Sequence, residues 1–152
     1  MADRFRMIVA LPGLEATEAL GAAIAARLGK GDAVLLEGDL GSGKTTLARA
    51  ILVALGVAEN VPSPTFTLAQ TYATERLAVT HYDLYRLKRA SEMDELGMEE
   101  ALDEGAVLIE WPERAGGRVP ANGLVVRLEA EAERRAILEG PAAWWSLDQH
   151  DV

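Results

Sequence analysis

The chain of 152 residues contains no cysteine. Without thiols, it has neither a disulfide framework nor a zinc site built on thiolates. The N-terminal segment Met1–Met7 lacks the apolar core of a signal peptide, and no apolar run reaches the length that spans a membrane. These absences fit a reducing compartment, and we expect a cytoplasmic location with no membrane partner.

Basic residues are few and scattered. Lys and Arg number 15 against 24 Asp and Glu, which gives a formal net charge of −9. A broad surface for nucleic acid needs clustered Lys and Arg to neutralise phosphates. The densest basic group, Arg86, Lys88 and Arg89, is more typical of a solvated start of a helix. We therefore expect no direct binding of RNA, and any role in RNA metabolism would pass through a protein partner.

Internal repeats, low-complexity segments and a domain linker are also missing from the sequence. The length predicts a single domain over residues 1–152, and 49% hydrophobic residues are enough for a sizeable core. From about residue 140 onward the tail, with Trp144 and Trp145, receives no role. Its two indoles are read first as packing against the core and second as a docking patch.

The most informative segment is a glycine-rich motif of the form G-x-x-x-x-G-K-T. Its residues are Gly38, Asp39, Leu40, Gly41, Ser42, Gly43, Lys44 and Thr45, followed by Thr46. In such a P-loop the glycines let backbone N–H groups turn towards phosphates, the lysine reaches the β- and γ-phosphates, and the last hydroxyl ligates Mg²⁺. An apolar run enters the loop at Ala33–Glu37, and helical spacing leaves it at Thr46–Leu55. Strand, loop and helix in this order predict a nucleotide-binding site.

Apolar periodicity predicts further elements on both sides of the motif. The expected additional strands are Arg6–Leu11, Thr65–Tyr72, Leu77–Tyr82, Ala106–Ile109, Leu124–Leu128 and Ala136–Leu138. The expected additional helices are Thr17–Leu28, an acidic helix at Ser91–Glu104 with Ser91 and Asp94 as a capping box, and a short one at Pro141–Leu147. Helices that alternate with strands and hairpins predict an α/β fold, a three-layer P-loop NTPase-like domain with a mixed sheet flanked by helices.

Hydrolysis or transfer needs more than a P-loop, because an acid must serve the metal and another group must position the nucleophile. Asp83 and Glu110 each directly follow a predicted strand. Either one alone could be an ordinary surface acid, but we expect at least one of the two to be functional. His81 would share a strand face with Asp83, and its role stays open, as does that of Arg86.

Two further features have alternative interpretations. Ser63-Pro64-Thr65-Phe66 offers two hydroxyls on a proline-stiffened loop, which is typical of a switch loop that senses the γ-phosphate, but also of a plain transition into a strand. Trp111 follows Glu110 and precedes Pro112. It could line a nucleotide or partner surface, although burial is the commoner fate of an aromatic side chain.

Four motifs in order resemble the TsaE family, small bacterial ATPases that are needed to make threonylcarbamoyladenosine on tRNA. The motifs are the P-loop at 38–46, SPTFTL at 63–68, HYDLYRL at 81–87 and EWPE at 110–113. The resemblance covers roughly residues 10–130. Four motifs in the right order are far more specific than a P-loop alone.

This resemblance implies roles for single residues. Thr45 and Glu110 match the Mg²⁺ ligands of the family, and Lys44 matches the phosphate lysine. Asp83 matches an acid needed near the γ-phosphate, and Thr65 matches a switch-like threonine. The resemblance also implies ATP and Mg²⁺ as cofactors, and as partners the proteins TsaD and TsaB. The family member would hydrolyse ATP to reset that complex between turnovers.

Two other function classes remain open on the residues alone. A small-molecule or nucleotide kinase would need an acceptor-binding segment, and the chain shows no insertion of that length after the P-loop. In a nucleotide-gated adaptor, ATP would only set the conformation without being hydrolysed.

The resemblance to the TsaE family also implies that residues near Glu15–Thr17 lie beside the base of the nucleotide.

Overall fold

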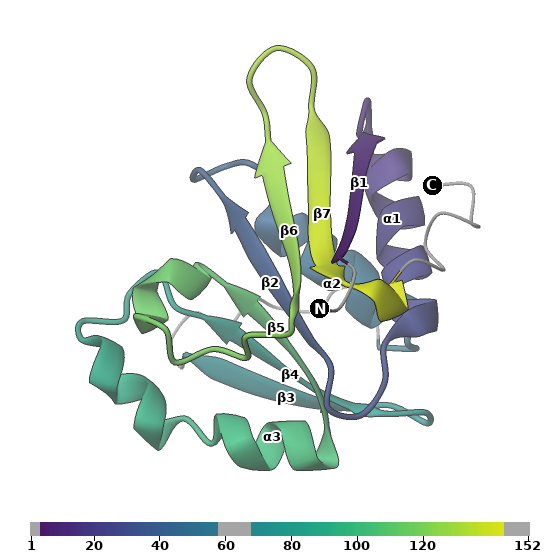
Figure 1. Ribbon diagram of the computed structural model, residues 1–152. Helices are drawn as coiled ribbons and strands as arrows, with labels where there is room; N and C mark the ends of the chain where they lie inside the picture. The colour runs from purple at the N-terminus through teal and green to yellow at the C-terminus, as the bar shows by residue number, and fades with distance from the viewer. Residues whose placement is uncertain (1–3, 58–67, 145–152) are drawn as a thin grey trace.

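A mixed β-sheet with helices on both faces forms the protein (Figure 1). The computed structural model describes residues 4–57 and 68–144. In chain order the elements are β1 (Arg4–Ala10), α1 (Leu14–Arg27), β2 (Ala33–Gly38), α2 (Lys44–Ala54), β3 (Ala69–Ala73), β4 (Ala78–Asp83), the 3-10 helix η1 (Ala90–Glu95), α3 (Met98–Glu104), β5 (Gly105–Glu110), the 3-10 helix η2 (Pro112–Ala115), β6 (Leu124–Glu129) and β7 (Arg135–Pro141).

The sheet has seven strands in the order β1-β7-β6-β2-β5-β4-β3. Strands β6, β2, β5 and β4 run parallel at its centre, whereas β1, β7 and β3 pair antiparallel with their neighbours. The predicted α/β fold with a mixed sheet is confirmed. Because the carboxyl ends of parallel strands meet at one edge, the segments that follow β2, β4 and β5 lie side by side there. Those segments carry the P-loop and the two strand-end acids.

Helices cover the two faces of the sheet unequally. Helices α1 and α2 pack on one face over a core that reaches from β1 to β4. On the other face, η1, α3 and η2 lie over β2, β5 and β4 (Figure 1). β5 is buried along its whole length, with Leu108 in the core under α2 and Ile109 in the core on the opposite side. A strand that is buried on both faces reads as an unbroken apolar run, which explains why it was recognisable in the sequence.

The other face of β1, β7 and β6 carries no helix in the described part of the chain. Its charged side chains pair across neighbouring strands: Arg6 with Glu139 at 3.6 Å, Arg135 with Glu129 at 2.7 Å and Arg127 with Glu37 at 3.3 Å. Such exposed pairs contribute little to stability. This open half of the sheet adjoins the P-loop and gives the site a wide solvent-facing side.

Close packing of β4 against β5 aligns the two strand-end acids. The parallel register pairs Ala78 with Gly105 at one end and Asp83 with Glu110 at the other. A Cβ atom on Gly105 would lie 1.9 Å from the carbonyl oxygen of Ala78, far inside contact distance. Only glycine therefore allows this approach, which in turn places both acids at the same edge.

The prediction of one acidic helix over Ser91–Glu104 is wrong. The chain instead forms η1, turns at Gly97 with φ 68°, and starts again as α3. Glycine adopts this left-handed conformation at no steric cost, so it separates the two helices. The capping bond also differs from the expected one: the carboxylate of Glu92 accepts a hydrogen bond of 3.2 Å from the backbone N–H of Arg89. Asp94, the residue expected to cap, accepts a bond from Arg118.

The ends of the chain differ less from expectation. Helix α1 begins at Leu14, one turn earlier than the apolar spacing indicated. Pro141 belongs to β7, Ala142–Trp144 form a 3-10 turn, and the rest of the expected tail helix lies outside the described residues. Trp144 is buried in the main core, as its first interpretation predicted. None of the helices in the described ranges is long and apolar enough to cross a membrane.

Candidate functional site

The glycines of the P-loop adopt backbone conformations that other residues rarely reach. Gly38, Gly41 and Gly43 have φ angles of 144°, 82° and 106°. At Gly38 a Cβ atom would lie 2.5 Å from the hydroxyl oxygen of Ser42 and 2.7 Å from a backbone oxygen of β6. Gly43 directly precedes the first turn of α2. The loop therefore wraps around the N-terminus of α2, whose free N–H groups and dipole favour an anion.

Lys44 folds back onto its own loop. Its ammonium group donates to the carbonyl oxygens of Gly38 at 2.6 Å and Asp39 at 2.9 Å, and the residue is 4% exposed. Burial lowers the pKa of the lysine, although the charge of Glu110 opposes this shift. The ammonium is thus held by neutral carbonyls, which a phosphate can replace with a stronger, charge-assisted bond.

Thr45, Glu110 and His81 form a chain of hydrogen bonds between α2 and the sheet. The Thr45 hydroxyl donates to Glu110 Oε1 at 2.7 Å, and His81 Nε2 lies 2.6 Å from Glu110 Oε2. Glu110 is 2% exposed and His81 is fully buried. The fold therefore brings the P-loop hydroxyl and the acid at the end of β5 into direct contact.

Asp83 lies beside this chain but is not bonded to it. Its Oδ1 accepts the backbone N–H of Tyr85 at 3.1 Å, and the residue is only partly exposed. Burial raises the pKa of the carboxyl group, while the bond from Tyr85 works in the opposite direction. A carboxyl group with a raised pKa at a cleft is a candidate for proton transfer or for orienting a nucleophile.

A pocket of about 280 Å³ joins these groups, and we call it the metal-side pocket. It is lined by Leu40, Gly41, Gly43, Lys44, Thr45, Thr46, Asp83, Tyr85, Glu110 and Trp111. The expected phosphate lysine, both expected metal ligands and the expected γ-phosphate acid therefore share one cavity. These four residues come from three separate segments of the sequence.

A second pocket of about 240 Å³ opens on another side of the loop and is called here the N-terminal pocket. The P-loop contributes Ser42, Gly43 and Thr46 to its lining, and Leu11–Leu14 and Thr17 contribute from the start of the chain. Of the segment expected beside the base, Glu15–Thr17, only Thr17 is part of this lining. Arg134, from the connection between β6 and β7, also lines the pocket and reaches towards Gly43.

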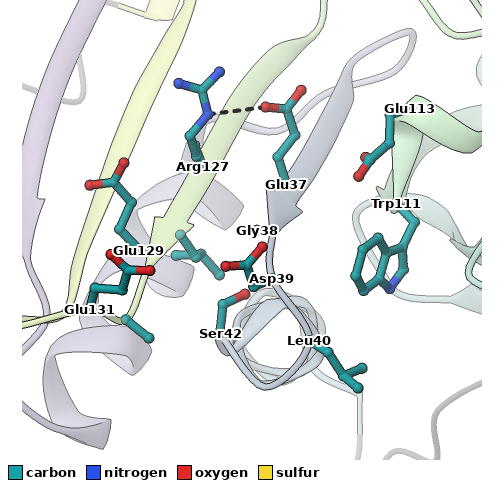
Figure 2. A pocket seen from close by; sticks show the side chains of 12 residues that line it. Glu37, Gly38, Asp39, Leu40, Ser42, Trp111, Glu113, Arg127, Glu129 and Glu131 are labelled. Carbon is teal, nitrogen blue, oxygen red and sulfur yellow. Dashed lines mark hydrogen bonds and ion pairs between the residues drawn. The ribbon is translucent and has the colours of Figure 1, made fainter.

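A third cavity, of about 670 Å³ and so larger than the two pockets above, lies on the open half of the sheet beside the loop (Figure 2). Its walls are strongly acidic: Glu113 projects from η2 opposite Glu129 and Glu131, and Glu37 pairs with Arg127 between them. Trp111 forms the wall on the η2 side. Such a cavity repels free phosphate, so the two smaller pockets are better suited to a nucleotide.

Trp111 is a site residue whose role the sequence left undecided. Its ring centroid lies 3.9 Å from the Lys44 ammonium and 5.0 Å from the ring of Tyr85, a cation–π contact and an aromatic pair. The guanidinium of Arg114 lies 5.3 Å from the Tyr85 ring. Sequence reasoning missed Tyr85 and Arg114. The only signal was the position of Trp111 directly after the strand-end acid.

The donor set suits Mg²⁺ together with nucleotide phosphates. Thr45 and Glu110 present oxygen atoms 2.7 Å apart at the N-terminus of α2. In residues 4–57 and 68–144 no group of three His, Asp or Glu side chains could hold a metal alone. Mg²⁺ typically binds to one or two protein oxygens plus substrate phosphates.

Thr65 and Ser63, the candidate switch residues, lie outside the described ranges, and Arg86 is exposed.

A known protein family matches most of this chain. A family described as threonylcarbamoyl adenosine biosynthesis protein TsaE matches residues 11–137. The chain belongs to the TsaE family. The match includes the P-loop, Asp83 and Glu110. The description of the family assigns its members to the biosynthesis of threonylcarbamoyladenosine.

Individual relatives support the same assignment. A Rickettsia felis protein named tRNA threonylcarbamoyladenosine biosynthesis protein TsaE is 50% identical over 65% of this chain and 58% of its own length. The aligned part is thus little more than half of that relative. A Mycobacterium bovis protein of the same name is 39% identical over 78% of this chain and 76% of its own. The crystal structure of Bacillus subtilis YdiB superposes with a TM-score of 0.77 at 27% identity, over 100% of this chain and 99% of that one.

Proposed function

We propose that the protein is a Mg²⁺-dependent ATPase that serves threonylcarbamoyladenosine modification of tRNA by acting on the TsaD–TsaB complex. The observation that carries this proposal is the contact of 2.7 Å between Thr45 and Glu110 inside the metal-side pocket. A P-loop hydroxyl joined to a strand-end carboxylate is the arrangement in which P-loop proteins hold Mg²⁺. Membership of the TsaE family supports the choice of pathway.

In this proposal the chain uses its own residues to bind and orient ATP. Lys44 leaves the carbonyls of Gly38 and Asp39 and bonds to the β- and γ-phosphates, while free backbone N–H groups of the P-loop surround them. Thr45 and Glu110 hold Mg²⁺, which when bound neutralises charge on the phosphate oxygens. Asp83, in the same pocket, orients the attacking water and accepts its proton.

The base is proposed to lie in the N-terminal pocket. This pocket shares Gly43 and Thr46 with the metal-side pocket, so one nucleotide can extend from one to the other across the loop. Leu11 and Leu14 supply apolar contact, and Arg134 supplies a cation near the phosphates. The preference for ATP rests on the family resemblance.

Action on a protein complex is favoured over action on a small acceptor. The metal-side pocket opens to solvent, and in the described ranges no inserted segment covers it. A site that does not exclude water hydrolyses slowly by itself and improves when a partner closes it. A net charge of −9 opposes direct contact with the tRNA backbone and fits contact through protein.

Phosphate release from ATP measured with and without TsaD and TsaB tests the proposal. We expect slow, Mg²⁺-dependent release by the chain alone and a several-fold rise when both partners are present. Brisk transfer of phosphate to a small acceptor without partners would instead identify a kinase. Nucleotide binding with no phosphate release under either condition would identify a nucleotide-gated adaptor. Either outcome would overturn the ATPase proposal.

Asp83→Asn is expected to lower the partner-stimulated rate about 100-fold, the usual contribution of a group that handles a proton. Asparagine keeps the shape of the side chain and its bond to the backbone N–H of Tyr85 but cannot accept a proton. ADP affinity should therefore change little, which isothermal titration can verify. Asp103→Asn, on the exposed end of α3, removes the same charge and serves as the control. A native rate for Asp83→Asn would refute the assigned role.

A further inference from the structure

His81 occupies a position in the fold that strand packing alone does not require. It lies in β4 on the face towards α2, together with Val79 and Asp83, and is fully buried. A buried imidazole usually has both ring nitrogens paired. Among residues 4–57 and 68–144, Nδ1 of His81 has no hydrogen-bond partner, whereas Nε2 lies 2.6 Å from Glu110 Oε2. The ring therefore makes one strong polar contact, and that contact is to Glu110.

This contact determines how the carboxylate of Glu110 is presented. An ionised carboxylate only accepts hydrogen bonds, so Nε2 carries the ring proton and is the donor of this bond. The bond occupies Oε2, and the other oxygen, Oε1, is left facing the hydroxyl of Thr45 at 2.7 Å. Without His81, Glu110 could rotate about its terminal bond, and its second oxygen would be buried without a donor.

The burial of the pair makes the orientation costly to change. The side chains of His81 and Glu110 are 1% and 2% exposed, so water does not reach the bond between them. A buried carboxylate without a donor is strongly disfavoured. His81 thus holds Glu110 in one rotamer before any ligand arrives, and binding need not order the side chain.

We propose that His81 is a positioning residue that orients Glu110 and thereby sets the affinity of the nucleotide-bound protein for Mg²⁺. The proposal rests on the function proposed above, in which Glu110 is a metal ligand. Loss of a partner that orients a metal ligand through a hydrogen bond typically lowers metal affinity by about 10- to 100-fold. His81 touches neither the nucleotide nor the metal in this scheme and acts only through Glu110.

Three substitutions separate this role from simple filling of the core. Glutamine carries an N–H donor at about the distance of Nε2 from the backbone, so His81→Gln retains the bond to Glu110. Asparagine is also polar but too short to reach Oε2, and His81→Leu fills similar volume with no donor. Thr80→Val is the matched control on β4. It removes a hydroxyl that forms a hydrogen bond of 3.0 Å with Thr71 Oγ1, and this bond is not part of the site.

Mg²⁺ is expected to tighten the binding of a fluorescent ADP, and the readout is the Mg²⁺ concentration that gives half of this effect. The measurement requires no turnover. We expect His81→Leu and His81→Asn to raise this concentration about tenfold or more, and His81→Gln and Thr80→Val to stay within about threefold of native. Affinity for ADP in excess EDTA should be equal in all the proteins. Mn²⁺ binding followed by electron paramagnetic resonance should show the same order.

The possible outcomes are distinct. If His81→Leu fails to fold, the two polar variants decide, and equal Mg²⁺ dependence of His81→Gln and His81→Asn overturns the proposal. Native Mg²⁺ dependence in a folded His81→Leu also overturns it and leaves the ATPase proposal intact. If the native protein itself shows no effect of Mg²⁺ on nucleotide binding, the metal site of the proposed function fails, and the role of His81 fails with it.

Discussion

Lys44→Met is expected to reduce ATP turnover by roughly 100- to 1000-fold, the loss typical when one charge-stabilising donor is removed from a transition state. Methionine is close in length to the lysine stem, but it has no ammonium to offer the phosphates, and the cation–π contact with Trp111 is lost. Affinity for ATP should fall as well, by about 1.5–3 kcal/mol for one charge-assisted hydrogen bond. Single-turnover hydrolysis and binding of fluorescent ATP measure the two effects separately.

Lys30→Met provides the control for Lys44, since it removes the same charge from an exposed position in the turn before β2. It should leave binding and hydrolysis unchanged. Thermal unfolding of both variants shows whether either loses the fold. A Lys44→Met protein that is folded and hydrolyses ATP at the native rate would contradict the assignment of the loop as a phosphate site.

Glu110→Gln is the second substitution with a large expected effect, and we expect Mg²⁺-dependent turnover to fall roughly 100-fold or more. The amide matches the carboxylate in shape but carries no charge for the metal. In the native protein the two carboxylate oxygens of Glu110 each face a donor, the hydroxyl of Thr45 and Nε2 of His81. The amide of glutamine has only one oxygen to accept from them. One of these bonds must be lost or turned, so a lower unfolding temperature is expected too, equivalent to about 1–3 kcal/mol.

Phosphate release titrated with Mg²⁺ measures this effect, with Glu104→Gln as the control at the exposed end of α3. The control removes one carboxylate at a distance from the pocket and should behave as native. If Glu110→Gln released phosphate at the native rate and with the native Mg²⁺ requirement, Glu110 would not be a metal ligand. The contact with Thr45 would then be a structural bond only.

The wall of aromatic and basic side chains over Lys44 has a consequence for binding. Trp111 stands 3.9 Å from the ammonium, with Tyr85 and Arg114 packed behind it. A triphosphate that draws Lys44 out of the loop changes the surroundings of the indole. This arrangement makes the indole a local reporter of nucleotide binding, in a protein from which Trp144 and Trp145 have been removed by substitution.

Local sequence patterns were sufficient for the parts of the fold that depend on neighbouring residues. The P-loop was recognisable because glycines at 38, 41 and 43 adopt φ angles that only glycine tolerates well. β2 and β5 were recognisable because burial on both faces requires continuous apolar runs. The prediction is wrong at Ser91–Glu104, where an acidic stretch with a possible capping box indicated one helix and Gly97 divides it into two short ones.

By itself, the sequence determined the chemical groups of this protein and the order in which they occur: a phosphate loop, then an acid at the end of each of two strands. The tertiary structure alone decided which of these groups meet. Thr45 and Glu110 are 65 residues apart and His81 and Glu110 are 29 apart. The parallel register of β4 on β5 and the packing of α2 on the sheet bring them within bonding distance. Such contacts depend on hydrophobic packing over the whole sheet, which no local pattern records.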